Sequence, residues 1–525
     1  MRKILILGLL LSTHQSFAGT ANSELSWYGA IPALLAIIMA IVSKQVILSL
    51  LIGLVSGSFL ESISSNSKSF FFGLDKVFDN YILGAIADNG HASVILFSLL
   101  IAGAINIMTK MGAFNGLIRW LAKYAKSKRS ALLITYFMGF FVFFDDYANT
   151  LVVGNTMRKI TDKFKISREK LAFIVDATAA PIASIAFVST WIGYEIQLIN
   201  DGLGDVRHPG MESAYGVFLN AIGYSFYPIV ILVFILVLIL TEKDFGSMRR
   251  FELAQRECLV VDQLDEKIIK PIWAVIPIII LLFVTIFGIY LTGRVDNGIV
   301  SAIQTGDCYV GLIWGSASCF VSVFLISLFV NNSVSNNINW MFDGMKELFP
   351  ALCVLILAWS LNSVLEDLKL GEFLGGLVLK NEISFTIIPV LTFVLSALIA
   401  FSTGSSFSTM GILIPIVISV CLSYYNSLGF ELGVFYASIA SVLSGAVLGD
   451  HCSPISDTTV LSSMATGCNH INHVKSQLPY CLIAGLIAVV LSILNGVFYL
   501  NLPLTYLIGV GLIYLIISCL GKPSS

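Results

Sequence analysis

Two polar stretches, each interrupting an apolar segment, decide the fold of this chain. The first reads Asp-Ala-Thr-Ala-Ala-Pro at 176–181 and divides the segment 169–199. The second reads Gly-Asp-His-Cys-Ser-Pro-Ile-Ser-Asp at 449–457 and divides the segment 431–463. In both, three or four residues separate an aspartate from a following Pro-Ile pair. Because proline removes a backbone donor and breaks helices, the pattern predicts two helices broken at membrane depth and an internal repeat.

The composition is typical of a membrane-embedded protein. Of 525 residues, 12% are charged and 57% are hydrophobic, and the mean hydropathy is +0.89. Soluble domains carry about 25% charged residues, so a water-soluble globule is excluded. The runs are too long and too uniformly apolar for barrel strands, which predicts an all-α polytopic membrane protein. Runs near the length that crosses about 30 Å of hydrocarbon fall at 27–43, 45–62, 91–109, 214–241, 271–293, 309–330, 345–366, 478–499 and 504–520.

The first eighteen residues are typical of a signal peptide. Arg2 and Lys3 precede the apolar run 4–11, and the small residues Ser16 and Ala18 follow where a signal peptidase cleaves. We therefore expect residues 1–18 to be removed, which leaves the mature N-terminus outside the cytoplasm; the alternative is an uncleaved first helix. The expected location is a cell (inner or plasma) membrane. The net charge is -2, so the chain has no excess of basic residues that would bind a nucleic acid. No cofactor is expected.

Lys and Arg gather in three segments, 110–129, 158–170 and 242–270, each of which carries six of them. Basic residues collect on the cytoplasmic side of a membrane protein, so all three segments are expected inside. The mostly apolar segment 130–157 then begins and ends on the same side, but it is too short for two full crossings, which need about 40 residues. A re-entrant hairpin resolves the conflict, with its tip at 144–150 surrounded by protein or by a water-filled cavity.

The second half repeats this order with the opposite orientation. Two apolar stretches within 383–425 are joined by the serine-rich tip 402–409, which predicts a second re-entrant hairpin. With about 11 transmembrane helices and the N-terminus outside, the first hairpin enters the membrane from the cytoplasm and the second enters from outside. The C-terminus is then cytoplasmic. Amphipathic stretches at 112–125 and 367–380 precede the two hairpins on opposite faces. Inverted repeats with broken helices are the architecture of secondary transporters.

The expected organisation is one transmembrane transporter domain over 27–520. Repeat 1 covers about 27–241, a cytoplasmic loop covers 242–270, repeat 2 covers about 271–499, and an extra helix follows at 504–520. No linker rich in Pro, Gly, Ser or charge divides this domain.

Acidic side chains occur at membrane depth without basic partners in either hairpin tip or either break, and such groups mark an ion or substrate path. Negative sites of this kind suit a cation, and neutral oxygen donors around them suit a hard alkali ion. Carboxylates at that depth also carry protons, because desolvation favours the neutral acid. Sodium and protons are therefore expected to compete, with Asp176 and Asp450 as the sodium candidates. The candidate ion- or substrate-binding residues are Asp145, Asp146, Asn149, Thr150, Asp176, Thr178, Ser405, Ser406, Thr409, Asp450, Ser453 and Asp457.

Each acidic position also has a structural interpretation. Asp145 and Asp146 suit a capped hairpin end at the interface, and Asp176 and Asp450 suit helix N-caps at the breaks. Glu195 suits an ordinary interfacial acid near the outer end of its helix.

A soft metal would need clustered His and Cys. Cys468, His470 and His473 lie close in sequence, but in an expected cytoplasmic loop that favours solvated side chains over a metal site.

The motifs resemble those of a known transporter family. The runs FFDDYANTLVVG (143–154), VDATAAPIASIAFVSTW (175–191) and GDHCSPISDTT (449–459) are similar to the NhaC family of sodium/proton antiporters in the ion transporter superfamily, with resemblance over about 90–500. The resemblance implies Na⁺/H⁺ exchange or, in relatives, exchange of organic acids such as malate and lactate, or amino-acid uptake.

Two transport functions remain open on sequence alone. The first is Na⁺/H⁺ antiport, with Na⁺ and H⁺ as the transported partners. The second is a Na⁺- or H⁺-coupled carrier of an organic anion or amino acid, because the serine-rich tip 402–409 could present donors to a carboxylate. A membrane hydrolase would not need mirrored breaks, so an enzyme is not expected. A channel is disfavoured because the chain shows no ring motif that would line a pore.

Overall fold

The computed structural model describes residues 27–43, 45–64, 70–204, 213–254, 269–293, 298, 302–303, 305–330, 332–380, 384–428 and 432–523. The expected signal peptide, 1–18, lies outside these residues. Within them the chain is almost entirely helical, which confirms the all-α class.

The first half of the chain forms short and long helices in alternation. Their bounds are η1 Trp27–Ala30, α2 Ile31–Ser43, α3 Val46–Ser64, α4 Phe70–Lys76, η2 Val77–Ile82, α5 Leu83–Ala87, α6 Asn89–Met111, α7 Ala113–Ala122, α8 Lys128–Phe141, α9 Asp146–Lys163, α10 Arg168–Ala177, α11 Ala180–Ala183, α12 Ile192–Leu203, α13 Ala214–Ile222 and α14 Phe226–Thr241. Many starts carry a side-chain cap, as at Ser127, Ser167 and Ser213, which satisfies a backbone donor of the first turn.

The second half begins with a two-residue strand and one more short helix. Its bounds are β1 Lys243–Asp244, α15 Gly246–Ala254, α16 Ile272–Thr292, α18 Cys308–Phe329, α19 Val334–Asp367, α20 Leu370–Lys380, η5 Phe385–Ile387, α21 Ile388–Thr403, α22 Ser406–Leu428, α23 Leu432–Cys452, α24 Asp457–Thr466, α25 His470–Gly496, α26 Leu502–Leu520 and β2 Lys522–Pro523. β1 pairs antiparallel with β2, which ties the C-terminus to the segment after α14.

Eleven helices within the described residues are long and apolar enough to cross a membrane. Leucine, isoleucine and phenylalanine side chains remain exposed along α16, α21 and α26, as expected for helices in contact with lipid. The helix expected over 345–366 begins earlier, at Val334, because Ser333 caps the amide of Asn336. α21 and α22 are each long enough to span a membrane by themselves, so their length does not show that the second hairpin is re-entrant. That the two helical hairpins are re-entrant stays a prediction.

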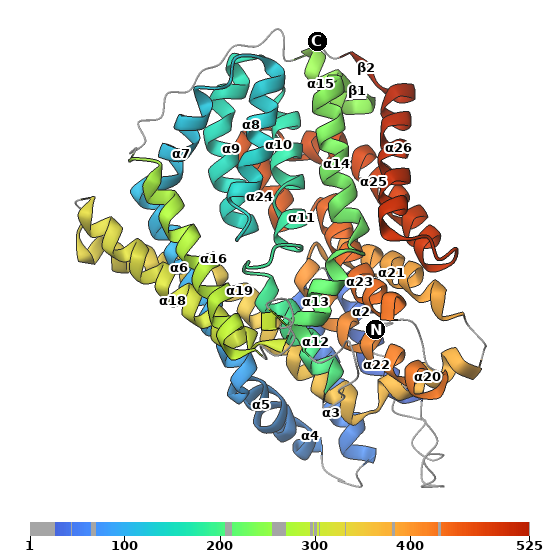
Figure 1. Cartoon of the computed structure of the whole chain (residues 1–525). Coiled ribbons are helices and arrows are strands. Elements are labelled where there is room, and N and C mark those ends of the chain that lie inside the picture. The colour runs from blue at the N-terminus through green and yellow to red at the C-terminus, as the bar shows by residue number, and fades with distance from the viewer. Residues whose placement is uncertain are drawn as a thin grey trace, which may run out of the picture.

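The expected breaks are present: α10 ends at Ala177 and α23 ends at Cys452. α10, α11 and α24 lie in the upper half of Figure 1, whereas α12 and α23 lie in the lower half. α7, α8 and α15, which belong to the basic segments, lie toward the end of the molecule that also holds the C-terminus (Figure 1). The expected amphipathic stretches form the short helices α7 and α20.

Each helical hairpin fits closely against the break in its own half. A Cβ on Gly139 of α8 would meet the Thr178 hydroxyl at 2.5 Å, so glycine permits the contact between the first hairpin and the first break. Gly404 ends α21 with φ +66°, and a Cβ there would meet the carbonyl oxygen of Ile455 at 2.8 Å. Both the positive φ and the close approach of Ile455 require glycine at 404. Each hairpin is therefore packed against the break in its own half of the chain.

Candidate functional site

The tip of the first hairpin is a tight turn between α8 and α9. Asp145 has extended backbone angles and accepts the amide of Ala148 at 2.7 Å, so it is the N-cap of α9. The carbonyl of Phe144 accepts the amide of Thr190 at 2.8 Å, which attaches the tip to the segment between α11 and α12. The capping interpretation is thus correct for Asp145, and the tip is held inside the protein.

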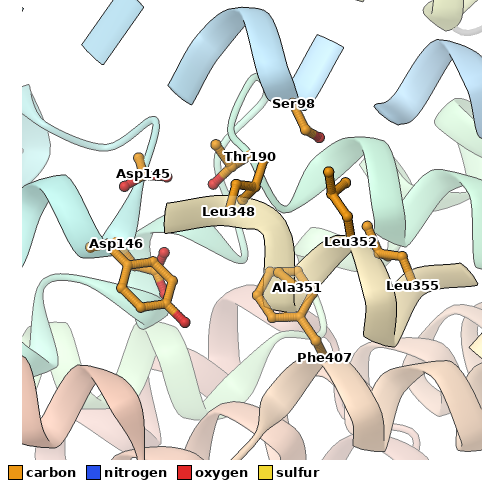
Figure 2. A pocket seen from close by; sticks show the side chains of 10 residues that line it. Ser98, Asp145, Asp146, Thr190, Leu348, Ala351, Leu352, Leu355 and Phe407 are labelled. Carbon is orange, nitrogen blue, oxygen red and sulfur yellow. The ribbon is translucent and has the colours of Figure 1, made fainter. Parts of the chain in front are cut away.

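A pocket opens beside this tip. Asp145, Asp146 and Thr190 lie on one side of it, and Ser98 of α6 lies at its margin (Figure 2). The rest of the lining is apolar and comes mainly from α19, with Phe407 of α22 (Figure 2). Its residues are Leu348, Ala351, Leu352, Leu355 and Phe407. No Lys, Arg or His is among the described residues that line the pocket, so its charge is acidic.

Asp146 differs from its neighbour because one of its oxygens remains without a donor. The side chain is 2% exposed, and its Oδ1 makes no hydrogen bond with any described group. The indole of Trp191 lies near this carboxylate but outside hydrogen-bond geometry. A buried carboxylate with a free oxygen is costly unless a cation or a proton neutralises it.

Tyr147, which the sequence prediction did not include, lies among carboxylates of both halves. Its hydroxyl donates to Asp457 at 3.3 Å, and the side chain is within electrostatic range of Asp145, Asp146 and Asp450. The side chain of Asp457 is exposed at the start of α24. Four of the predicted acidic residues therefore do come together around one tyrosine.

Asp450 stands in the last turn of α23, before the second break. Its Oδ2 accepts the hydroxyl of Ser406, the first residue of α22, at 3.0 Å, and its Oδ1 makes no hydrogen bond within the described chain. The N-cap interpretation of Asp450 is wrong, because the residue ends a helix rather than beginning one. This contact joins the second tip to the second break.

Asp176 also ends a helix, α10, so its N-cap interpretation is wrong as well. It does not line the pocket. Its Oδ2 lies 3.3 Å from Nε2 of His473 and accepts the amide of Gln477 at 3.1 Å. Gln477 also donates to the carbonyl of His451, whose Nδ1 is 2.7 Å from the hydroxyl of Tyr227. Asp176 thus belongs to a second polar cluster.

His473 was expected in a cytoplasmic loop, and that expectation is wrong. It lies in the first turn of α25 with a fully buried side chain. Asn469 caps the helix, so the helix begins at His470. The signal that could have placed it is the spacing of the buried polar residues His473, Ser476, Gln477 and Tyr480, which share one helix face.

Glu195 was expected to be an interfacial acid, but it is fully buried in the first turn of α12. Neither of its carboxylate oxygens makes a hydrogen bond with a described group. It does not line the pocket.

The predicted neutral side chains mostly satisfy local backbone groups. Asn149 donates to the carbonyls of Gly139, Val142 and Thr178, so it joins the hairpin to the first break. Ser453 donates to the carbonyl of Phe401 at 2.8 Å. Four hydroxyl groups make a hydrogen bond within their own helical segment: those of Thr150, Thr178, Ser405 and Thr409. No group of three or more potential metal-ligating side chains occurs among the described residues.

The sequence of the chain matches a protein-family model. Residues 182–497, which include the second break, match the Na⁺/H⁺ antiporter family. The chain belongs to this family. It is accordingly a multi-span membrane protein and a secondary transporter of ions or small solutes, as the sequence motifs predicted.

Relatives of the chain include one of nearly equal length. An uncharacterized protein of Haemophilus influenzae is 34% identical over 470 residues, covering 87% of this chain and 88% of that protein. The malate-2H(+)/Na(+)-lactate antiporter of Bacillus subtilis is 26% identical over 191 residues, 34% of this chain and 37% of that protein. The arginine/ornithine antiporter ArcD of Halobacterium salinarum is 33% identical over 107 residues, 20% of each chain.

Two solved transporters share the fold at low sequence identity. MtrF of Neisseria gonorrhoeae, described as one of a class of antimetabolite efflux pumps, has a TM-score of 0.56 at 12% identity and covers 82% of this chain and 86% of that one. The YdaH transporter of Alcanivorax borkumensis has a TM-score of 0.58 at 14% identity, covering 82% and 90%. At these identities the likeness concerns the fold alone.

Proposed function

We propose that this antiporter exchanges Na⁺ for H⁺, with the cation held by Asp146 and Asp450 at the meeting point of the two halves. The observation that carries the proposal is that each of these buried carboxylates has an oxygen that accepts no hydrogen bond from the described chain. The two side chains are within electrostatic range of one another, and the adjoining pocket has an acidic side without basic lining residues. Oxygen atoms in such a setting suit an alkali cation.

Exchange follows from competition for the same oxygens. Two buried carboxylates close together repel each other, so the site favours states in which H⁺ or Na⁺ is bound. Relative movement of the repeats would then expose the site to each side in turn. The orientation that we propose has the mature N-terminus outside, with the basic segments and the C-terminus in the cytoplasm.

A coupled carrier of organic acids or amino acids is the second candidate. Two relatives that match part of the chain exchange such solutes, and the apolar wall formed by Leu348, Leu352 and Phe407 could contact a carbon chain. The contacts of the second tip favour the cation instead, because the Ser406 hydroxyl donates to the Asp450 carboxylate rather than facing an anion.

Transport in proteoliposomes tests both candidates. An imposed Na⁺ gradient with an internal pH dye should produce proton movement that needs no organic solute. The same vesicles loaded with malate, lactate, arginine or ornithine report any coupled uptake. Proton movement that occurs only with one of these solutes present would reject Na⁺/H⁺ exchange in favour of the carrier.

A further inference from the structure

We propose that Trp191 is a positioning residue of the cation site, whose indole N–H alternates with the cation as the partner of the free oxygen of Asp146. The inference rests on the proposed function and deepens it, because it names the donor that Na⁺ displaces when it binds. Trp191 is the residue before α12, and Asp146 is the first residue of α9.

Both groups are buried without a hydrogen-bond partner. Trp191 is 1% exposed, and its Nε1 donates to no described group. Oδ1 of Asp146 likewise accepts from none. An unpaired polar group inside a protein costs free energy and calls for an explanation. Because the indole can only donate and the carboxylate can only accept, pairing them would remove both costs at once.

The two groups are neighbours, but they are not paired in this conformation. The indole lies close enough to Asp146 to influence its carboxylate, yet the contact falls outside hydrogen-bond geometry. The unpaired arrangement suits the state in which a cation or a proton neutralises the carboxylate. A hydrogen bond from the indole suits the state in which the carboxylate is charged, because donors bind an ionised acceptor more strongly.

The surroundings of Trp191 hold its indole in place. Its amide donates to the hydroxyl of Ser189 at 3.2 Å, and its ring packs on Phe407 with ring centroids 4.9 Å apart. The amide of Thr190 donates to the carbonyl of Phe144, which keeps the hairpin tip beside the indole. A rotation of the carboxylate side chain, rather than a movement of the tryptophan, therefore switches between the two arrangements.

This arrangement agrees with competition at one set of oxygens. Na⁺, H⁺ and the indole N–H all use the same carboxylate, so each lowers the affinity for the others. The indole stabilises the charged carboxylate after Na⁺ leaves, which weakens Na⁺ binding and favours its release.

Trp359 of α19 is a matched control. It is also 1% exposed, and its Nε1 also donates to no described group. Its ring stacks on His91 with ring centroids 3.9 Å apart, and it does not line the pocket. Trp359 thus shares the burial and the unpaired N–H of Trp191 but not the neighbouring Asp146.

The first measurement uses the purified full chain, with the indole nitrogens of its seven tryptophans isotope-labelled for magnetic resonance. The Trp191 signal is identified by its loss in Trp191→Phe. We expect Na⁺ to shift this signal, because the carboxylate turns from the N–H to the cation, whereas choline at the same concentration should not. A Trp191 signal that does not respond to Na⁺ overturns the inference.

The second measurement compares Na⁺ affinities in reconstituted protein. Trp191→Phe keeps an aromatic ring but removes the N–H that competes with Na⁺. The apparent Na⁺ affinity for exchange of labelled Na⁺ against Na⁺ should rise at least about fivefold, because the charged carboxylate loses a donor. The assay is run at alkaline pH, where protons compete least. Trp359→Phe loses the same ring atoms and should leave the affinity unchanged.

A tighter affinity separates the proposed role from a structural one, because damaged packing lowers the amount of active protein without strengthening Na⁺ binding. Unchanged or weaker affinity in Trp191→Phe overturns the inference and leaves the proposed exchange standing. If Trp191→Phe does not fold, single Phe variants of the other six tryptophans identify the Trp191 signal by elimination, and its response to Na⁺ decides. Absence of Na⁺/Na⁺ exchange in the unmodified protein is a different result and rejects the proposed function itself, together with the role of Trp191.

Discussion

Asp145 and Asp146 are adjacent in sequence but differ in what their carboxylates contact. Asp145 accepts the amide of Ala148 and caps α9, whereas Asp146 has a buried oxygen that accepts no hydrogen bond from the described chain. The turn between α8 and α9 thus assigns one acid to the backbone and leaves the other available to a cation.

This difference predicts opposite results for two matched substitutions. Asn caps helices about as well as Asp, so Asp145→Asn should change the free energy of unfolding by less than about 0.5 kcal/mol and retain exchange. Asp146→Asn removes a charge from the proposed site and should weaken Na⁺ binding at least tenfold, about 1.4 kcal/mol or more. Na⁺-dependent proton flux at equal protein level is the measurement. Equal losses in both variants would contradict the division of roles.

Ser406 and Asp450 predict a pH-dependent effect. The Ser406 hydroxyl stabilises the charged carboxylate at 3.0 Å, so Ser406→Ala should let protons compete better with Na⁺. The apparent Na⁺ affinity should then fall more at pH 6 than at pH 9. Ser405→Ala, which removes a hydroxyl that only accepts the Ser408 amide, is the control. An affinity loss that is independent of pH would argue against the competition.

The sequence predicted the elements that composition and helix-breaking residues control. The long apolar runs, the break after Asp176 and the break after Asp450 all appear where proline and polar residues interrupt hydrophobic sequence. The contact between Tyr147 of the first half and Asp457 of the second was not among its predictions.

Contacts between distant segments could not be predicted in the same way. His473 looked like a loop residue because Cys468, His470 and Lys475 around it are polar, but tertiary packing against Asp176 buries it. Local pattern could not distinguish the cap role of Asp145 from the free oxygen of Asp146 either. That distinction depends on where α9 begins, which a sequence indicates only to within a few residues.

Asn149 should prove structural rather than ion-binding. Its amide nitrogen donates to the carbonyls of Gly139, Val142 and Thr178. Asn149→Ala leaves these buried acceptors unpaired, at a cost of about 1–3 kcal/mol, and should lower the melting temperature of the detergent-solubilised protein. Thr156→Ala, on a part-buried face of the same helix, is the comparison. An Asn149→Ala variant of unchanged melting temperature with lost Na⁺ binding would return Asn149 to the site.

The proposed topology predicts which side chains an impermeant thiol reagent reaches from outside. Cysteines replacing the exposed residues Lys126 and Lys165 should be shielded in intact cells, whereas one replacing the exposed Lys380 should react. The background carries Cys519→Ser, because that native cysteine is exposed. Labelling at Lys165 from outside would remove the argument for a re-entrant first hairpin.

The last prediction concerns the ion pair that anchors the broken helix α10. Lys170, in its first turn, donates to Asp244 of β1 at 2.7 Å, and the Asp244 carboxylate also accepts the hydroxyl of Tyr480. Both charged side chains are almost fully buried. Removing one partner of such a pair deprives the other of its hydrogen-bonded counter-charge and costs about 3–5 kcal/mol. Lys170→Met and Asp244→Leu should therefore each lower the unfolding midpoint markedly.

The double variant supplies the decisive comparison. Replacement of both partners by apolar groups removes the unpaired charge, so Lys170→Met/Asp244→Leu should be more stable than either single variant, with a coupling free energy of at least about 1 kcal/mol. Exchange should recover with stability, because neither residue lies at the proposed sodium site. If the losses simply add, the two side chains do not act as a pair. If stability recovers without exchange, the pair has a part in transport itself, beyond anchoring α10.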